Sequence, residues 1–168
     1  MTFGGEMSPE VLAIHPEFRG THMPLNWLRR QYENKTGEPF DTLAYIFLTA
    51  QNDGKGKFSQ VMLDFSRADG GVLEYTPPVG WPHGNLLRRI LYSMNFPPVG
   101  GYQKNLPLYL DQKASPYGMG TTFFYCQIQG HYGAGKVNTN YDFSGKQQQA
   151  HVQIWLNREK NDPRVRYQ

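Results

Sequence analysis

Cysteine is nearly absent from this chain, and its absence excludes two classes of site. Cys126 is the single cysteine among 168 residues, so neither an intramolecular disulfide nor a cysteine-based metal site can form. Cys126 alternates with Phe124 and Ile128 in a strand-like run, which places the three side chains on one face. We therefore expect a small buried thiol rather than a nucleophile, because a reactive thiolate needs a cationic, partly exposed setting.

Charged residues are also scarce. They make up 18% of the chain, below the roughly 25% usual in soluble domains. The net charge is only +3, and Glu159 and Asp162 dilute the basic residues near the C-terminal end. Nucleic-acid-binding proteins carry a denser basic stripe, so a nucleic-acid partner is not expected. Gly, Asn, Gln, Thr and Tyr supply the polar surface, which favours an extracytoplasmic or cell-envelope location, although the first residues lack a signal-peptide pattern.

Long hydrophobic runs are missing as well. The most apolar stretch, residues 43–50, is far shorter than the roughly 20 residues that a membrane-spanning helix needs. We expect no transmembrane span in this chain, so that a membrane complex would be reached only through a partner.

Catalytic and metal-binding motifs are not found either. The histidines at positions 15, 22, 83, 131 and 151 never stand at metal-ligand spacing, and no serine lies in a G-x-S-x-G turn. We therefore expect no metal, no cofactor and no catalytic residue. Asp64 and Glu74 lie in strand-like runs and could form a glycosidase carboxylate pair, although such acids are more often solvent-facing. The sequence leaves enzymatic activity open and favours its absence.

One stretch nearly matches a phosphate-binding loop. Gly130-His-Tyr-Gly-Ala-Gly-Lys136 has the G-x-x-x-x-G-K spacing, but Val137 stands where a Ser or Thr must ligate Mg²⁺. The residues that follow are of extended rather than helical type, so no helix N-terminus would face a phosphate. We expect no nucleotide and interpret the stretch as a Gly-rich turn between antiparallel strands.

Strand-like runs are the main positive feature of the first half. Residues 42–49 and 58–65 are rich in aliphatic and aromatic side chains and flank Asn52-Asp-Gly-Lys-Gly56, a strong hairpin signal. A second turn at Asp69 leads into residues 72–75. These elements predict a three-stranded meander.

The second half contains further strands. Residues 123–129 and 150–156 alternate, with Val152, Ile154 and Leu156 facing the core from the latter. Residues 136–143 and 106–110 are weaker strand candidates. Gly-rich residues 115–120 are long enough for a binding loop.

Two or three helices are expected in addition to these strands. One opens at Ser8-Pro9 and covers residues 8–14. A second opens at Pro24, places Leu28 and Tyr32 on one face and ends at Gly37. A third covers residues 83–94 between two Pro-Pro-Val-Gly repeats, which would fix its entry and exit or serve as polyproline ligands.

These elements predict an α+β fold, with an antiparallel sheet of about six strands and two or three short helices packed on one face. We expect an irregular N-terminal arm at residues 1–22, a single domain at residues 23–157 and a polar basic tail at residues 158–168.

Aromatic and amide side chains give the strongest indication of a binding surface. Tyr125, Tyr132, Tyr141 and Trp155 fall on strand faces opposite the inferred core, interleaved with glutamines. Such a surface is typical of protein interfaces and also suits stacking against sugars. The alternative is that a second helix or sheet layer covers this face.

The two ends are the second candidate interface. Neither has enough apolar periodicity to build a core, and such ends fray unless something orders them. The expected apolar anchors are Phe3, Phe18 and Tyr167. The basic residues Arg164 and Arg166 would bridge to acidic groups on a partner.

Two functions from different classes fit these observations. The first is a non-catalytic structural or accessory subunit that docks into a larger protein assembly through its aromatic surface and its ends. The alternative is an extracytoplasmic glycan- or polymer-binding module, or a hydrolase, built on the same aromatic surface.

Overall fold

The computed structural model describes residues 2–3, 10–15, 17–18, 22–52, 54–55, 58–76, 86–109, 120–141 and 148–165. Within these ranges the chain forms ten strands in two five-stranded antiparallel sheets, two α-helices and one short 3₁₀ helix. The expected class, mainly antiparallel sheet with a few helices, is confirmed. The expected number of about six strands was too small.

Sheet I has the strand order β1-β10-β9-β8-β6, and each pair of neighbouring strands is antiparallel. Its strands are β1 (Thr2–Phe3), β6 (Gly70–Tyr75), β8 (Thr121–Ile128), β9 (His131–Tyr141) and β10 (Gln148–Leu156).

Sheet II has the order β3-β2-β4-β5-β7 and is also antiparallel throughout. Its strands are β2 (Glu10–Ala13), β3 (His22–Pro24), β4 (Tyr45–Asn52), β5 (Phe58–Asp64) and β7 (Asn105–Pro107).

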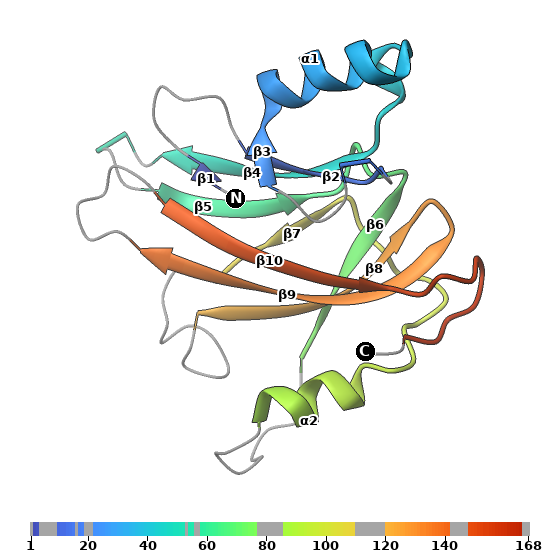
Figure 1. Cartoon of the computed structure of the whole chain (residues 1–168). Coiled ribbons are helices and arrows are strands. Elements are labelled where there is room, and N and C mark those ends of the chain that lie inside the picture. Colours follow the sequence, from blue (N-terminus) through green and yellow to red (C-terminus); the bar gives the residue numbers. More distant parts are fainter. Residues whose placement is uncertain are drawn as a thin grey trace.

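The central core lies between the two sheets, which stack face to face (Figure 1). Strand alternation selects its members, because every second side chain of each strand points inward. Phe124, Cys126 and Ile128 face this core from β8, as the sequence predicts, and Ile46 and Leu48 face it from β4.

The helices cover the opposite outer faces of the sandwich. α1 (Leu25–Thr36) packs on sheet II and α2 (Leu86–Ser93) packs on sheet I, so the layers follow the order α1, sheet II, sheet I, α2 (Figure 1). The expectation that the helices share one face is therefore wrong. Both sheets are apolar on their outer sides as well, and each outer face needs its own cover.

Two local expectations are also wrong. The segment expected as a first helix contains β2, where Val11 and Ala13 face the α1 side while Leu12 faces the central core. The supposed irregular arm thus contributes strands to both sheets. The expected meander fails after β5, because Phe65 and Ala68 are buried between the sheets and the chain then enters sheet I as β6.

The near match to a phosphate-binding loop, residues 130–136, lies in the β8–β9 hairpin. Its turn is only Gln129 and Gly130, both with positive φ (51° and 80°), and β9 starts at His131. The antiparallel pairing is as predicted, but most of the Gly-rich stretch is strand rather than turn. Gly133 and Gly135 are needed inside β9, since a Cβ on Gly133 would lie 2.7 Å from Leu156 Cδ2 and 2.8 Å from Cys126 Sγ.

The two long edges of the sandwich differ. At one edge, Val72 in β6 and Gln103 before β7 exchange backbone hydrogen bonds of 2.7 and 2.8 Å, which join sheet I to sheet II. At the other edge, β10 faces β2 and β3. On the side of β10 away from β9, the only described strand is β1, which pairs at Gln148 and Gln149. This open edge positions the candidate site.

Candidate functional site

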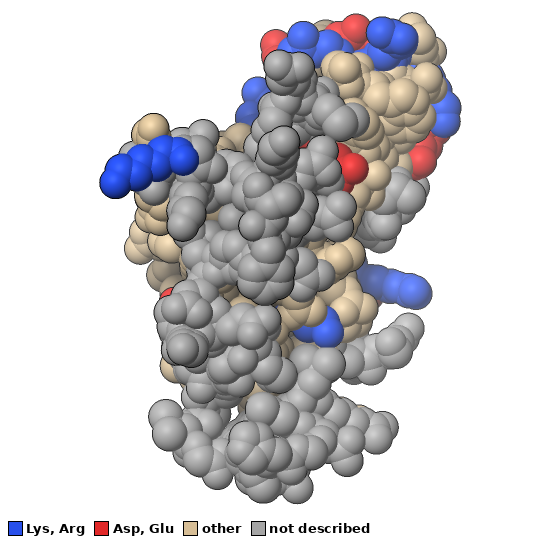
Figure 2. All heavy atoms as spheres, turned by 90° about the vertical axis from the view of Figure 1, so that its left-hand side faces the viewer, with Lys and Arg blue, Asp and Glu red and all other residues tan. Residues whose placement is uncertain are grey.

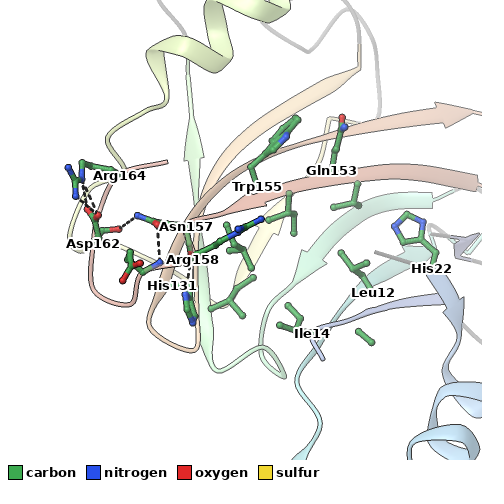
Figure 3. Close-up of a pocket in the computed structure, with 16 residues that line it drawn as sticks. Leu12, Ile14, His22, His131, Gln153, Trp155, Asn157, Arg158, Asp162 and Arg164 are labelled. Atoms are coloured by element: carbon green, nitrogen blue, oxygen red, sulfur yellow. Dashed lines mark hydrogen bonds and ion pairs between the residues drawn. The ribbon is translucent and has the colours of Figure 1, made fainter. Parts of the chain in front are cut away.

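A pocket of about 1140 Å³ opens between the sheets at the open edge (Figure 3). We call it the edge groove. The side chains that define it come from β2, β3, β9, β10 and the segment after β10; they are Leu12, Ile14, His22, His131, Val152, Gln153, Ile154, Trp155, Leu156, Asn157, Arg158, Glu159, Asp162 and Arg164.

The floor of the edge groove is apolar. Leu12 and Ile14 from sheet II meet Val152, Ile154 and Leu156 from sheet I, and all five remain only partly buried beside the central core. Complete burial of such a side chain is worth about 1.5–3 kcal/mol relative to exposure. The floor therefore retains apolar surface that a bound group could remove from water.

A hydrogen-bonded turn closes one end of the edge groove. His131 Nδ1 lies 2.9 Å from the Asn157 carbonyl oxygen, and the Asn157 N–H donates to the Tyr132 carbonyl at 2.8 Å. The Asn157 amide also donates to the Asp162 carbonyl at 3.1 Å and accepts from the Glu159 N–H at 3.0 Å. These bonds hold residues 157–162 against the β8–β9 hairpin.

The rim at this end carries charge. Arg164 donates to both carboxylate oxygens of Asp162, with a shortest contact of 2.6 Å, and this hydrogen bonding holds the pKa of the Asp162 carboxyl below its ordinary value. Arg158, which is exposed, makes no hydrogen bond or ion pair with any described residue. Figure 3 shows its side chain reaching over the pocket from the end of β10.

His22 lies at the other end of the edge groove, on β3 (Figure 3). Burial is the main cause that lowers the pKa of its imidazole, and the nearby Glu10 carboxylate only partly opposes that effect. The lowered pKa favours the neutral imidazole of His22 at pH 7. Arg158 and Glu159 are the charged side chains of the lining that have no side-chain partner among the described contacts, and Arg158 is the basic one.

The described residues hold no group of three or more His, Cys, Asp or Glu side chains arranged to bind a metal ion. Asp64 and Glu74, the possible carboxylate pair, lie in different sheets. Asp64 accepts from the Ser66 N–H at 2.7 Å. Glu74 accepts from the Tyr109 hydroxyl at 2.6 Å, which raises the pKa of Tyr109 to about 12. The two acids therefore lie in separate sheets and have separate partners.

The expected exposure of Tyr125 and Tyr132 is wrong. They are only 7% and 6% exposed, and Tyr125 packs edge-on against Tyr75 at a centroid distance of 5.3 Å beneath α2. Burial raises the pKa of Tyr125 to about 12. The alternative stated from the sequence, a second layer over this face, is what the structure contains.

The other predicted interface residues are scattered. Trp155 and Arg164 line the edge groove, whereas Phe18 is buried beside α1. Phe3 lies in β1 and its backbone pairs with Gln148 in β10. The side chain of Tyr141, and residues Arg166 and Tyr167, lie outside the described part of the chain, as does most of the predicted binding loop at residues 115–120.

Part of the supposed basic tail belongs to the domain itself. Val165 is 3% exposed, packs in the α2 cluster with Ile90 and Met94, and donates its N–H to the Asn95 carbonyl at 2.9 Å. The sequence gives no periodic signal for this contact, because a single valine among polar residues has no pattern.

Sequence reasoning missed most of the edge groove. Val152, Ile154 and Leu156 were expected as ordinary core, and Leu12 and Ile14 as part of a short helix. Their partial exposure depends on which strands stand opposite each other. No short-range signal contains that information.

A second exposed apolar surface lies at the end of α2. Tyr92, Phe96 and Val99 are 57%, 73% and 76% exposed; Phe96 directly precedes the second Pro-Pro-Val-Gly repeat and Val99 lies within it. We call it the α2 patch. None of its three residues lines the edge groove, so it provides a comparison surface.

Among the described residues on the face shown in Figure 2, blue and red spheres are interspersed over α1. Arg29, Arg30, Glu33 and Lys35 are the charged residues of that helix. None of the helices in the described part of the chain is long and apolar enough to cross a membrane.

A scan against protein-family models finds no match to this chain. Searches of curated proteins and of solved structures likewise find no match. We therefore infer the function from the geometry of the edge groove.

Proposed function

We propose that this protein is a non-catalytic accessory subunit that docks into a larger protein assembly by accepting an extended segment of a partner protein along β10. The position of β10 is the observation that carries the proposal. β1 lies beside it only at Gln148 and Gln149, while β10 continues to Leu156 along the edge groove. A strand added there would extend sheet I and cover the apolar floor.

The composition of β10 supports this proposal. Exposed edges usually carry charges, prolines or bulges that prevent pairing with other chains. Residues 151–156 contain no proline and no Lys, Arg, Asp or Glu. Their pairing with β9 is continuous, with no shift of register from Gln148 to Leu156. An edge with continuous register and without Lys, Arg, Asp or Glu favours strand addition.

The glycan-binding alternative was based on Tyr125, Tyr132, Tyr141 and Trp155 as an exposed aromatic surface. The rings of Tyr125 and Tyr132 are buried, Tyr125 in the α2 cluster and Tyr132 beside Tyr102, so neither offers an open face to a sugar. This burial favours the assembly function over the glycan-binding module.

Site-specific photo-crosslinking tests the proposal. A benzophenone side chain replaces Gln153 at the edge groove, and in a matched protein it replaces Val99 on the α2 patch. We expect the first to capture one defined partner segment and the second to capture none. Capture alone is insufficient, so a synthetic peptide of the captured segment must also bind the purified protein.

A pair of charge insertions provides the matched control. Val152→Asp places a carboxylate on the groove floor, whereas Val99→Asp places the same group on the α2 patch. Because an unpaired buried charge is strongly unfavourable, Val152→Asp should weaken partner binding by at least about tenfold. Circular dichroism checks that both variants fold. Partner capture at Val99, or normal binding by folded Val152→Asp, would show that docking occurs elsewhere.

A further inference from the structure

We infer that the segment bound at the edge groove is a short strand antiparallel to β10, with alternating apolar side chains and an acidic residue at its N-terminal end. This inference rests on the proposed function, because it specifies the chemistry of the segment that the groove accepts.

The direction follows from sheet I. All four of its strand pairs are antiparallel, and β1 already pairs antiparallel with β10 through Thr2 and Gln149. Antiparallel pairing is slightly more stable per residue than parallel pairing. A segment that continues the β1 position along β10 would therefore run in the same direction as β1.

The side-chain pattern follows from the register rule for antiparallel strands. Directly opposed residues point to the same side of the sheet. Segment residues opposite Val152, Ile154 and Leu156 would thus point between the sheets, toward Leu12 and Ile14. Their neighbours would point to the outer side with Gln153. Six residues opposite positions 151–156 would span about 20 Å, at roughly 3.4 Å per residue.

The charge follows from Arg158. It lies just past Leu156, where an antiparallel segment begins, and reaches over the pocket (Figure 3). Asp162 is engaged by Arg164, and Glu159 forms no ion pair with Arg158 among the described contacts. His131 at this end is bonded to the Asn157 carbonyl. An Asp or Glu at the start of the segment would give Arg158 a charge-assisted hydrogen bond.

Three synthetic peptides test the inference against the ¹⁵N-labelled full chain by NMR. All are acetylated and amidated, so only side chains differ in charge. The first is Asp-Val-Thr-Val-Thr-Val-Thr, the second has Asn in place of Asp, and the third is the first in reverse order. We expect chemical-shift changes at the backbone amides of β10. The first peptide should bind about two- to fivefold more tightly than the second, as for a solvent-exposed ion pair.

The variant Arg158→Gln removes the charge without removing a described contact. It should abolish the preference for Asp over Asn while leaving binding of the Asn peptide unchanged. Preservation of the NMR spectrum shows that the variant is folded.

The outcomes separate the inference from the proposed function. If all three peptides shift β10 equally, or if Arg158→Gln keeps the preference for Asp, the acidic residue is wrong although strand addition stands. Tighter binding of the reversed peptide overturns the antiparallel direction. If no peptide shifts β10, the proposed function itself fails. Decanoate serves as a last probe, and binding of decanoate alone would make the groove a site for small amphipathic acids.

Discussion

Replacing Val165 with Ala tests whether the end of the chain belongs to the core of its own domain. Val165 is 3% exposed and packs with Ile90, Met94 and Tyr125 between sheet I and α2. The change removes two methyl carbons, worth about 1.6 kcal/mol at about 0.8 kcal/mol per buried carbon. The remaining cavity should raise the loss of unfolding free energy to roughly 2–3 kcal/mol.

Urea unfolding followed by tryptophan fluorescence measures this loss. With a urea dependence of about 2 kcal/mol per molar, the midpoint should fall by about 1–1.5 M. Val99→Ala is the matched control, since the same two carbons are removed from a side chain that is 76% exposed. Its unfolding free energy should change by no more than about 0.5 kcal/mol.

The comparison has a clear refuting result. If Val165→Ala and Val99→Ala unfold at the same urea concentration, Val165 does not pack against α2 and the tail is free to dock on a partner. The packing described here instead implies that deleting residues 158–168 destabilises the isolated domain. That outcome differs from the division expected from the sequence, in which the domain ends at residue 157 and residues 158–168 form a tail outside it.

Two further predictions concern β8 and β9. Gly135→Ala should lower the unfolding free energy by about 1–3 kcal/mol, because the added Cβ meets the Phe124 ring and would lie 2.6 Å from the Gln153 carbonyl oxygen. Gly100→Ala is the control, because a Cβ at this position meets open space. Equal stabilities of the two variants would show that β9 and β10 lie farther apart than described. Cys126 is fully buried, and burial raises the pKa of its thiol. Labelling by a disulfide reagent at pH 8 should be at least about a hundredfold slower in the native protein than in urea, since the thiol is reached only after local opening, and rapid native labelling would mean that Cys126 faces outward.

Local features of the fold were predictable where a short segment contains the whole physical reason. α1 begins after Pro24 and ends at Gly37, whose left-handed φ of 70° lets its N–H bond to the Glu33 carbonyl at 3.0 Å. The antiparallel pairing of β4 with β5 follows from the Asp-Gly signal between the two strands. The facing of Cys126 follows from alternation alone.

The candidate site was much less predictable. Trp155 and Arg164 were named from composition and do line the edge groove, but the floor was not recognised as a site. Apolar alternation predicts that a side chain faces inward, but it does not predict whether another segment of the structure buries that side chain completely. For Ile154, complete burial would need a further strand at the open edge.

The sequence by itself determined the positions of the main strands and helices, the facing of β8 and β10, and the absence of a disulfide. These properties depend on residues that are near each other along the chain, through alternation, helical periodicity and turn chemistry. Only the tertiary structure decided that the chain divides between two sheets, that α2 covers Tyr125, and that Val165 completes a core. It also left β10 at an open edge above a partly buried floor. Those outcomes depend on contacts between segments far apart in sequence, and no local pattern encodes which strand lies beside which.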